Sequence, residues 1–144
     1  MVSITRRLEF DAGHRVLGHE GHCKHLHGHH YVVEITVSAS SLDSLGRVLD
    51  FGKVKELVGG WLNREWDHNL LLHPADPLLM LDDAMQRVIF AGKKPYVMEC
   101  GNPTAENMAE ELWENASKLL PAGMKVSQVR VWETPNCYAD FFPG

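Results

Sequence analysis

One segment of the chain, residues 29–40, has a pattern typical of a β-strand with one buried face. Its side chains follow a period of two, which in a strand places successive residues on opposite faces. The residues of one face are Tyr31, Val33, Ile35 and Val37, and they alternate with Val32, Glu34, Thr36 and Ser38. Such a strand fits a sheet that packs one face against helices and leaves the other to solvent.

The rest of the sequence supplies three more strands and two clear helices. Residues 3–14, 124–134 and 137–142 read as strands, and residues 50–66 as a helix in spite of Gly59 and Gly60. The clearest helix covers residues 104–120, with Pro121 and Gly123 ending it. Residues 73–101 are less regular, although a short helix fits residues 82–90. The order β-β-α-α-β-β predicts an α+β fold, a four-stranded antiparallel sheet with helices on one face.

Length and charge limit the classes of protein to consider. The 144 residues fit a single domain, 1–144, with enough chain for a proper core. No apolar run approaches the ~20 residues of a membrane span, and the N-terminus lacks the apolar core of a signal peptide. A net charge of −5 without a Lys/Arg cluster argues against nucleic acid as a partner. Three unpaired cysteines, Cys23, Cys100 and Cys137, favour a reduced, cytoplasmic protein.

Histidines dominate one short stretch, since seven of the nine lie between His14 and His30. His27 and His29 are two residues apart at the start of a strand, so their rings point to the same side. His14 ends the first strand and can supply a third ligand if the two strands form a hairpin. Three histidines around zinc leave a fourth position open for water or substrate. The alternative is a histidine-rich loop that binds metals only adventitiously.

Cys23 admits two interpretations beside these histidines. A thiolate is itself a strong zinc ligand. If three histidines satisfy the metal instead, the cation stabilises the thiolate form, and Cys23 becomes a base or nucleophile. The chain has neither the His-Glu-x-x-His helix of zinc proteases nor the Pro-Cys-x-x-Cys element of deaminases.

Five short motifs together resemble the 6-pyruvoyl-tetrahydropterin synthase superfamily. In chain order they are FDAGHR, CKHLHGH, WDHNLL, NPTAEN and VWETPN, and the resemblance as a whole runs from residue 4 to about residue 138. Three residues separate Cys23 from His27, as in the bacterial 6-carboxy-5,6,7,8-tetrahydropterin synthase branch of queuosine biosynthesis; the 6-pyruvoyl synthases have five. Residues 73–101 form a longer segment than in the compact bacterial enzymes.

The resemblance implies a fold, an assembly and a reaction. The fold is the tunnelling fold (T-fold), whose sheets join into an oligomeric barrel, here expected as a homohexamer made of two trimers. The active sites then lie at subunit junctions. The reaction is a zinc-dependent lyase step from 7,8-dihydroneopterin triphosphate to 6-carboxy-5,6,7,8-tetrahydropterin, acetaldehyde and triphosphate. Two alternatives remain: a 6-pyruvoyl-tetrahydropterin synthase acting on the same substrate, and a non-enzymatic metal-binding protein.

The resemblance also implies roles for individual residues. Cys23 is the proton acceptor, His68 exchanges protons with its orientation fixed by Asp67, and Glu133 joins the proton relay. Without the resemblance, Asp67 and His68 could equally cap a helix, and Glu106 could favour the dipole of a helix that Thr104 caps. Arg15 and Lys24 border the site and are candidates for triphosphate contacts. The zinc ligands are His14, His27 and His29, and the pterin is bound by Thr104, Glu106 and Glu133.

Overall fold

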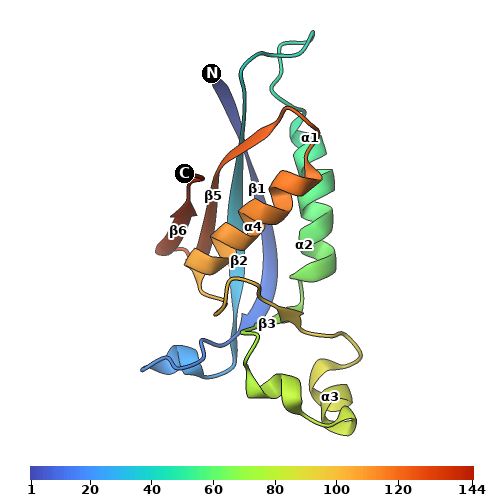
Figure 1. The fold of residues 1–144 in the computed structure, drawn as a ribbon, viewed down its shortest axis with the longest axis vertical. Helices are drawn as coiled ribbons and strands as arrows, with labels where there is room; N and C mark the ends of the chain where they lie inside the picture. The colour runs from blue at the N-terminus through green and yellow to red at the C-terminus, as the bar shows by residue number, and fades with distance from the viewer.

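The fold is built on one six-stranded sheet in the order β4-β3-β1-β2-β5-β6 (Figure 1). The structure is a computed structural model that describes residues 1–144. The strands are β1 (Val2–His14), β2 (His27–Ala39), β3 (Asn69–Leu72), β4 (Tyr96–Val97), β5 (Lys125–Thr134) and β6 (Cys137–Phe141).

Four of these strands form the antiparallel sheet that the sequence predicts. β1 pairs with β2 along its whole length, from Val2 opposite Ala39 to His14 opposite His27. β2 then pairs with β5, and β5 with β6, both antiparallel. The odd-numbered residues of β2 from Tyr31 to Val37 are fully buried, as their alternation indicates. The α+β, T-fold-like arrangement is therefore confirmed at the level of one chain.

Two short strands extend the sheet beyond the prediction. β3 runs parallel to β1 and pairs with it only at residues 12–14. β4 has two residues and pairs parallel to β3. Segments this short carry no readable period, and their pairing depends on contacts distant in sequence, so local pattern alone does not predict them.

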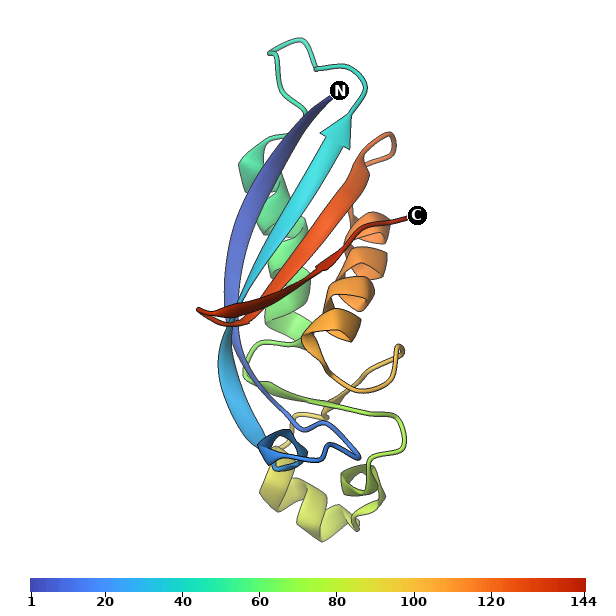
Figure 2. The ribbon, with the colours of Figure 1, turned by 90° about the vertical axis from the view of Figure 1, so that its left-hand side faces the viewer.

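The helical segments within residues 51–65 and 105–119 cover one face of the sheet (Figure 2). The predicted helix over 50–66 forms three consecutive helical segments, with a π-helical turn in the middle that begins at Lys55 and ends at Gly59. Asp50 caps its start by accepting a hydrogen bond from the backbone N–H of Gly52. The segments are α1 (Phe51–Val54), the π-helical turn (Lys55–Gly59), α2 (Gly60–Glu65) and, separately, α4 (Ala105–Leu119). One hydrophobic core fills the space between these helices and the sheet.

Residues 73–95, which precede β4, form an appendage at the lower end of the sheet in Figure 1. It contains a 3₁₀ turn, Pro77–Met80, and α3, Asp83–Phe90, close to the short helix that the sequence suggests. None of the residues of α3 is buried, and Val88 is 77% exposed. The appendage therefore adds little to the core.

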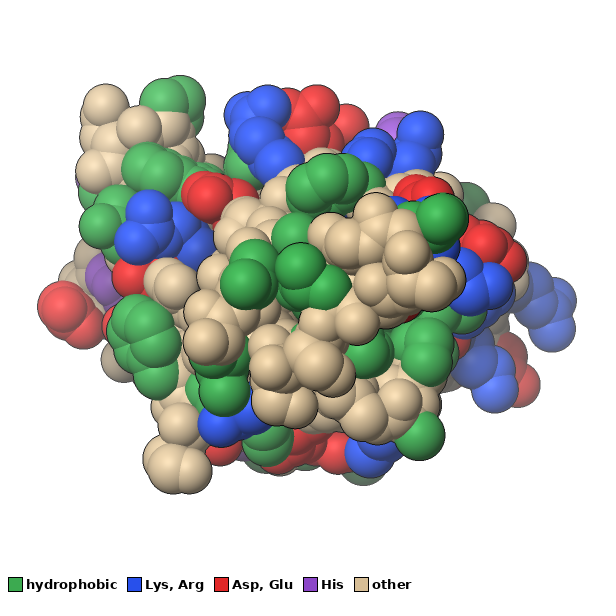
Figure 3. Space-filling view, turned by 90° about the horizontal axis from the view of Figure 1, so that it is seen from above, with side chains coloured by type: hydrophobic (Ala, Val, Ile, Leu, Met, Phe, Trp, Pro, Cys, Tyr) green, Lys and Arg blue, Asp and Glu red, His purple; other side chains and the backbone are tan.

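The opposite end of the molecule exposes apolar side chains around the N-terminus and the 40–50 loop (Figure 3). Val2, Leu42, Leu45 and Phe51 are all exposed there. Across the whole chain, no helix combines the length and the apolar character that crossing a membrane requires.

Candidate active site

Three histidines converge at the lower end of the β1–β2 pair. His14 and His27 are direct partners in the register of the two strands, and His29 faces the same side two residues further along β2. The ring centroids lie 4.6 Å apart for His14 and His27, 5.1 Å for His14 and His29, and 4.8 Å for His27 and His29. One ligand atom from each ring lies within 4.8 Å of the others, a grouping that could hold a metal ion.

Backbone carbonyls fix the orientation of two of these rings. Nδ1 of His14 donates to the carbonyl of Pro103 at 2.7 Å, and Nδ1 of His27 donates to the carbonyl of His25 at 2.6 Å. A carbonyl only accepts, so each neutral ring carries its proton on Nδ1 and leaves a lone pair on Nε2. These two Nε2 atoms face each other at 3.1 Å. A cation between them satisfies both lone pairs, and imidazole suits zinc, so the residues present fit the metal that the resemblance implies.

Burial favours the neutral, metal-binding form of two of the three rings, those of His14 and His29. Burial lowers the pKa of His14, which is 1% exposed, and burial likewise lowers the pKa of His29. Nε2 of His29 is buried and makes no hydrogen bond. Oε1 of Glu133 lies 3.5 Å from that atom. The predicted relay acid therefore sits directly beside the histidine cluster.

Cys23 lies next to this cluster but outside it. It sits in a 3₁₀ turn, His22–Lys24, and its thiol is not one of the atoms that converge with the three rings. Tyr31 lies beside the cluster, with its hydroxyl 3.2 Å from Nδ1 of His14. Burial raises the pKa of Tyr31, and the negative charges of Glu133 and of a Cys23 thiolate raise it further. The geometry favours a free thiol over a fourth protein ligand.

Asp67 and His68 form a second group at the edge of the sheet. Nδ1 of His68 lies 3.0 Å from Oδ2 of Asp67, and the backbone of Asp11 holds both residues. Asp11 donates its N–H to Oδ1 of Asp67 at 3.0 Å, and its carbonyl accepts from the N–H of His68 at 2.6 Å. Burial opposes the ionisation of Asp67, but the hydrogen bonds from Asp11 and His68 lower its pKa overall.

This second group is not joined to the three histidines by any hydrogen bond or ion pair. The His68 side chain is 76% exposed and lines a groove of about 570 Å³. His29 and the end of α3, at Ile89 and Phe90, line the same groove. Within one chain, the structure thus places Cys23 and the Asp67–His68 pair in separate groups.

The predicted pterin-binding residues begin α4. Thr104 is the N-cap, and its hydroxyl oxygen accepts from the N–H of Asn107 at 3.2 Å. Its hydroxyl proton stays free to donate. Glu106 is exposed in the first turn and makes no hydrogen bond within the chain. Glu106 is therefore both a favourable first-turn acid and a carboxylate open to a ligand.

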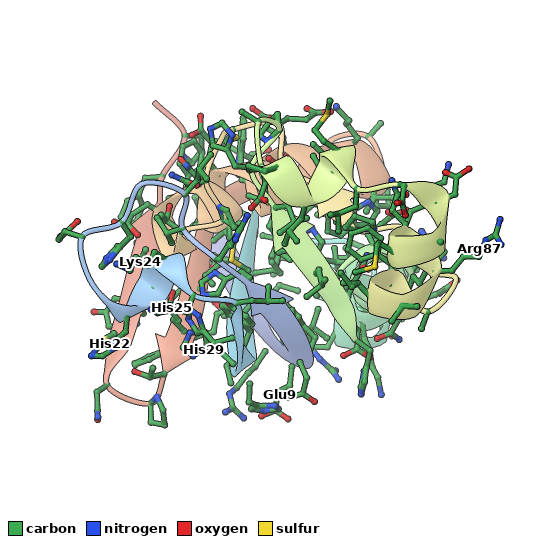
Figure 4. The ribbon with its side chains drawn as sticks, turned by 90° about the horizontal axis from the view of Figure 1, so that it is seen from below. Glu9, His22, Lys24, His25, His29 and Arg87 are labelled. Atoms are coloured by element: carbon green, nitrogen blue, oxygen red, sulfur yellow. The ribbon has the colours of Figure 1, made fainter.

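The two cations considered for the triphosphate differ in availability. The guanidinium of Arg15 is held by the buried carboxylate of Asp76, with Nε 2.7 Å from Oδ2. Lys24 is exposed on the same side of the molecule as His29, whereas Arg87 projects from α3 on the opposite side (Figure 4). Of the two candidates, only Lys24 remains free. The Arg15–Asp76 pair joins residues 61 positions apart, and no local motif signals it.

Comparisons with known proteins agree with the fold and the motifs. Residues 3–143 match the family described as 6-pyruvoyl tetrahydropterin synthase. A 6-carboxy-5,6,7,8-tetrahydropterin synthase from Rickettsia bellii is 43% identical over 143 residues, covering 97% of this chain and 99% of the relative. One from Aquifex aeolicus is 32% identical and covers 96% of each chain.

Solved structures share the fold at lower identity. An uncharacterized protein from Wolinella succinogenes superposes with a TM-score of 0.79 at 24% identity, covering 99% of this chain and 98% of that one. The 6-pyruvoyl tetrahydropterin synthase of Caenorhabditis elegans gives a TM-score of 0.67 at 21% identity, covering 99% and 96%. With the family match spanning nearly every residue, the chain belongs to the 6-pyruvoyl tetrahydropterin synthase family.

Proposed function

We propose that this protein is a 6-carboxy-5,6,7,8-tetrahydropterin synthase, a zinc-dependent lyase of queuosine biosynthesis. It converts 7,8-dihydroneopterin triphosphate to 6-carboxy-5,6,7,8-tetrahydropterin, acetaldehyde and triphosphate. Relatives named for this synthase are 41–44% identical over nearly the whole chain, which supports the choice within the family. The single observation that carries the chemistry is the pair of facing Nε2 atoms of His14 and His27, 3.1 Å apart.

The histidine cluster is the proposed metal site. His14, His27 and His29 would hold the ion, with the Nδ1 protons of the first two anchored on backbone carbonyls. A zinc ion bound there would supply Lewis-acid chemistry toward the side-chain hydroxyls of the substrate, which would acidify the adjacent C–H bond. Because the metal needs no further protein ligand, Cys23 is free to act as a base.

The proton transfers fall to the acid–base residues. Cys23 accepts a proton from a substrate carbon, which demands a base that is ionised near the working pH. His68 returns or removes a second proton, and Asp67 holds its ring by the 3.0 Å contact to Nδ1. Glu133 stands beside His29, close enough to take part in the relay.

We propose that carboxylates bind the pterin ring through hydrogen bonds. A carboxylate accepts two parallel N–H bonds from the 2-amino group and N3–H of the ring, and rings that lack this edge lose both. Glu106 and Glu133 are the candidates, with the free hydroxyl proton of Thr104 as a further donor. Lys24 is the candidate for the triphosphate.

We further propose that the active site is assembled between subunits of a homohexamer. Two observations support this assembly. β6 pairs only with β5, so its outer edge is open to another strand. His68 is largely exposed and belongs to a different group of side chains from the three histidines, so a neighbouring copy can supply it beside Cys23. Three free cysteines support a cytoplasmic location.

Product analysis tests the function. The purified protein is incubated with 7,8-dihydroneopterin triphosphate, and the pterins are identified by mass. We expect 6-carboxy-5,6,7,8-tetrahydropterin with acetaldehyde in equal amount. Formation of 6-pyruvoyl-tetrahydropterin instead would assign the other activity of the family, and no turnover by zinc-loaded protein would refute the enzyme proposal.

A further inference from the structure

Glu111 is a fully buried acid that the proposed reaction does not use. It lies on α4 with an exposed fraction of 0%. A buried carboxylate must be compensated by hydrogen bonds, because its desolvation is costly. Oε1 accepts from the backbone N–H groups of Glu99 at 2.8 Å and of Cys100 at 2.9 Å. Glu111 therefore fixes the chain just before the loop that leads into α4.

That loop, residues 101–104, reaches the histidine cluster. The side chain of Asn102 exchanges two hydrogen bonds with the backbone of Leu17, at 2.8 and 3.0 Å, which ties the loop to the segment following β1. The next carbonyl, that of Pro103, accepts the Nδ1 proton of His14. Glu111 thus holds the start of the loop through the backbone N–H groups of residues 99 and 100. Near its end, the carbonyl of Pro103 keeps the proton of the His14 ring on Nδ1.

The second oxygen of Glu111 takes no part in these backbone hydrogen bonds. Oε2 is buried without a hydrogen bond, and so is Nε1 of Trp66. The Tyr96 ring centroid is 5.9 Å from that of Trp66. Burial first, and then the Glu111 carboxylate, raises the pKa of Tyr96. A phenol can accept from an indole N–H and donate to a carboxylate at once, so Tyr96 is suited to link the two.

Trp66 and Tyr96 flank the acid–base pair. Trp66 is fully buried and directly precedes Asp67. β3 begins immediately after His68, and its residue Leu71 is paired with Tyr96 of β4. Tyr96 therefore contacts the chain on both sides of the pair, through the Trp66 ring and through its strand partner Leu71.

We propose that Glu111 is a positioning residue that holds two parts of the active site from one buried carboxylate. It acts on His14 through the 99–103 loop and on the Asp67–His68 pair through Tyr96. The metal-site half stands on the histidine cluster alone. The kinetic half rests on the proposed function.

The first experiment measures metal affinity. Glu111→Gln keeps the size of the side chain but removes its charge, which weakens both backbone hydrogen bonds. Competition with a chromophoric chelator should show zinc affinity lowered by roughly tenfold, the lower end of the range for outer-shell partners of metal ligands. Glu56→Gln is the control, because it also removes one carboxylate charge but from an exposed side chain that pairs only with Lys53; it should bind zinc as the unaltered protein does.

A Glu111→Gln protein that folds and binds zinc with unaltered affinity would overturn the proposed action of Glu111 on the metal site. If that variant does not fold, Glu111→Asp replaces it: the charge stays, the reach is shorter, and the same direction of change is expected. A lower melting temperature without a change in zinc affinity would show a purely structural role.

The second experiment tests whether Glu111 acts on the Asp67–His68 pair through Tyr96. Tyr96→Phe keeps the ring and removes the hydroxyl next to Glu111. We expect kcat to fall by roughly tenfold or more through misplacement of the acid–base pair, with KM and zinc affinity unchanged. An unaltered kcat would overturn this half. If the unaltered protein shows no turnover, the proposed function fails, while the zinc measurement on Glu111→Gln still decides the role of Glu111.

Discussion

His14 and His27 face each other across the β1–β2 pair with their Nε2 atoms 3.1 Å apart and both Nδ1 atoms bonded to carbonyls. When both rings are neutral and carry their protons on Nδ1, the lone pairs of the two Nε2 atoms point at each other. This arrangement is unfavourable without a cation between them. The strand register makes the two residues direct partners, so the geometry follows from the backbone. The pair is therefore prepared for a metal ion by the fold itself.

The first prediction is that His27→Ala loses the metal. Elemental analysis of the unaltered protein should give about one zinc per chain, as a three-histidine site requires. Removal of a direct ligand should lower affinity by more than ~100-fold, beyond the range seen for outer-shell partners. His25→Ala is the control, because that exposed side chain is removed while the carbonyl that holds His27 stays. Full zinc content in His27→Ala would refute the assignment.

The second prediction concerns Cys23. Cys23→Ala should keep zinc and fold but lose turnover by ~10²-fold or more, because a general base is removed. Cys23→Ser should do little better, since a hydroxyl ionises far less readily. Metal content and rate are measured on the same sample, with Cys137→Ala, which removes an exposed thiol, as the control. Loss of zinc with the Cys23 thiol would favour a ligand role, and an unaltered rate would contradict both roles.

The parts of this molecule that sequence predicts are those with a local period. The alternation in residues 29–40 predicts β2, its buried face and the shared orientation of His27 and His29, and the structure confirms that face. A hairpin of the first two strands then brings His14 to the same place, as the register confirms. Four strands and two main helices follow from the same kind of pattern.

The unpredicted parts depend on contacts between distant segments. The carbonyl of Pro103 that orients His14 lies 89 positions away, and a backbone group carries no side-chain signature. The Arg15–Asp76 ion pair joins residues 61 positions apart. It occupies the Arg15 guanidinium, which the sequence alone suggests as a contact for the triphosphate. Such contacts exist only once the chain has folded.

The third prediction is that Asp76 stabilises the fold through Arg15. The Asp76 side chain is fully buried and accepts two hydrogen bonds from the guanidinium. Asp76→Asn should lower the free energy of unfolding by about 3 kcal/mol, the scale for breaking one partner of a buried pair. Urea denaturation measures this. Glu56→Gln, which removes an exposed ion pair with Lys53, should have a much smaller effect.

The effect of Asp76→Asn should also depend on pH. Burial opposes ionisation of Asp76, but Arg15 and the N–H of Leu78 lower its pKa below the ordinary 3.8 overall. The unfolded chain then binds the proton more readily, so the stabilisation is complete above about pH 5 and is lost as the pH falls through 3.8 toward the folded value. A difference between the two proteins that stays constant from pH 6 to about pH 3 would contradict this account.

The last prediction tests whether one site uses two chains. In one chain Cys23 and His68 lie in separate groups, and His68 is 76% exposed. Cys23→Ala and His68→Ala should each be inactive alone. When the two variants are co-expressed, random assembly should restore about a quarter of the sites, those that take Cys23 from one copy and His68 from its neighbour.

The control is a mixture of Cys23→Ala with His27→Ala, which should stay inactive because both residues come from the same chain in any site. Light scattering on the active sample should show an oligomer. If the co-expressed Cys23→Ala and His68→Ala variants show no activity, or if a monomer is fully active, then each chain carries a complete site. Restored activity in the first mixture alone would instead place the reaction at the junction between subunits.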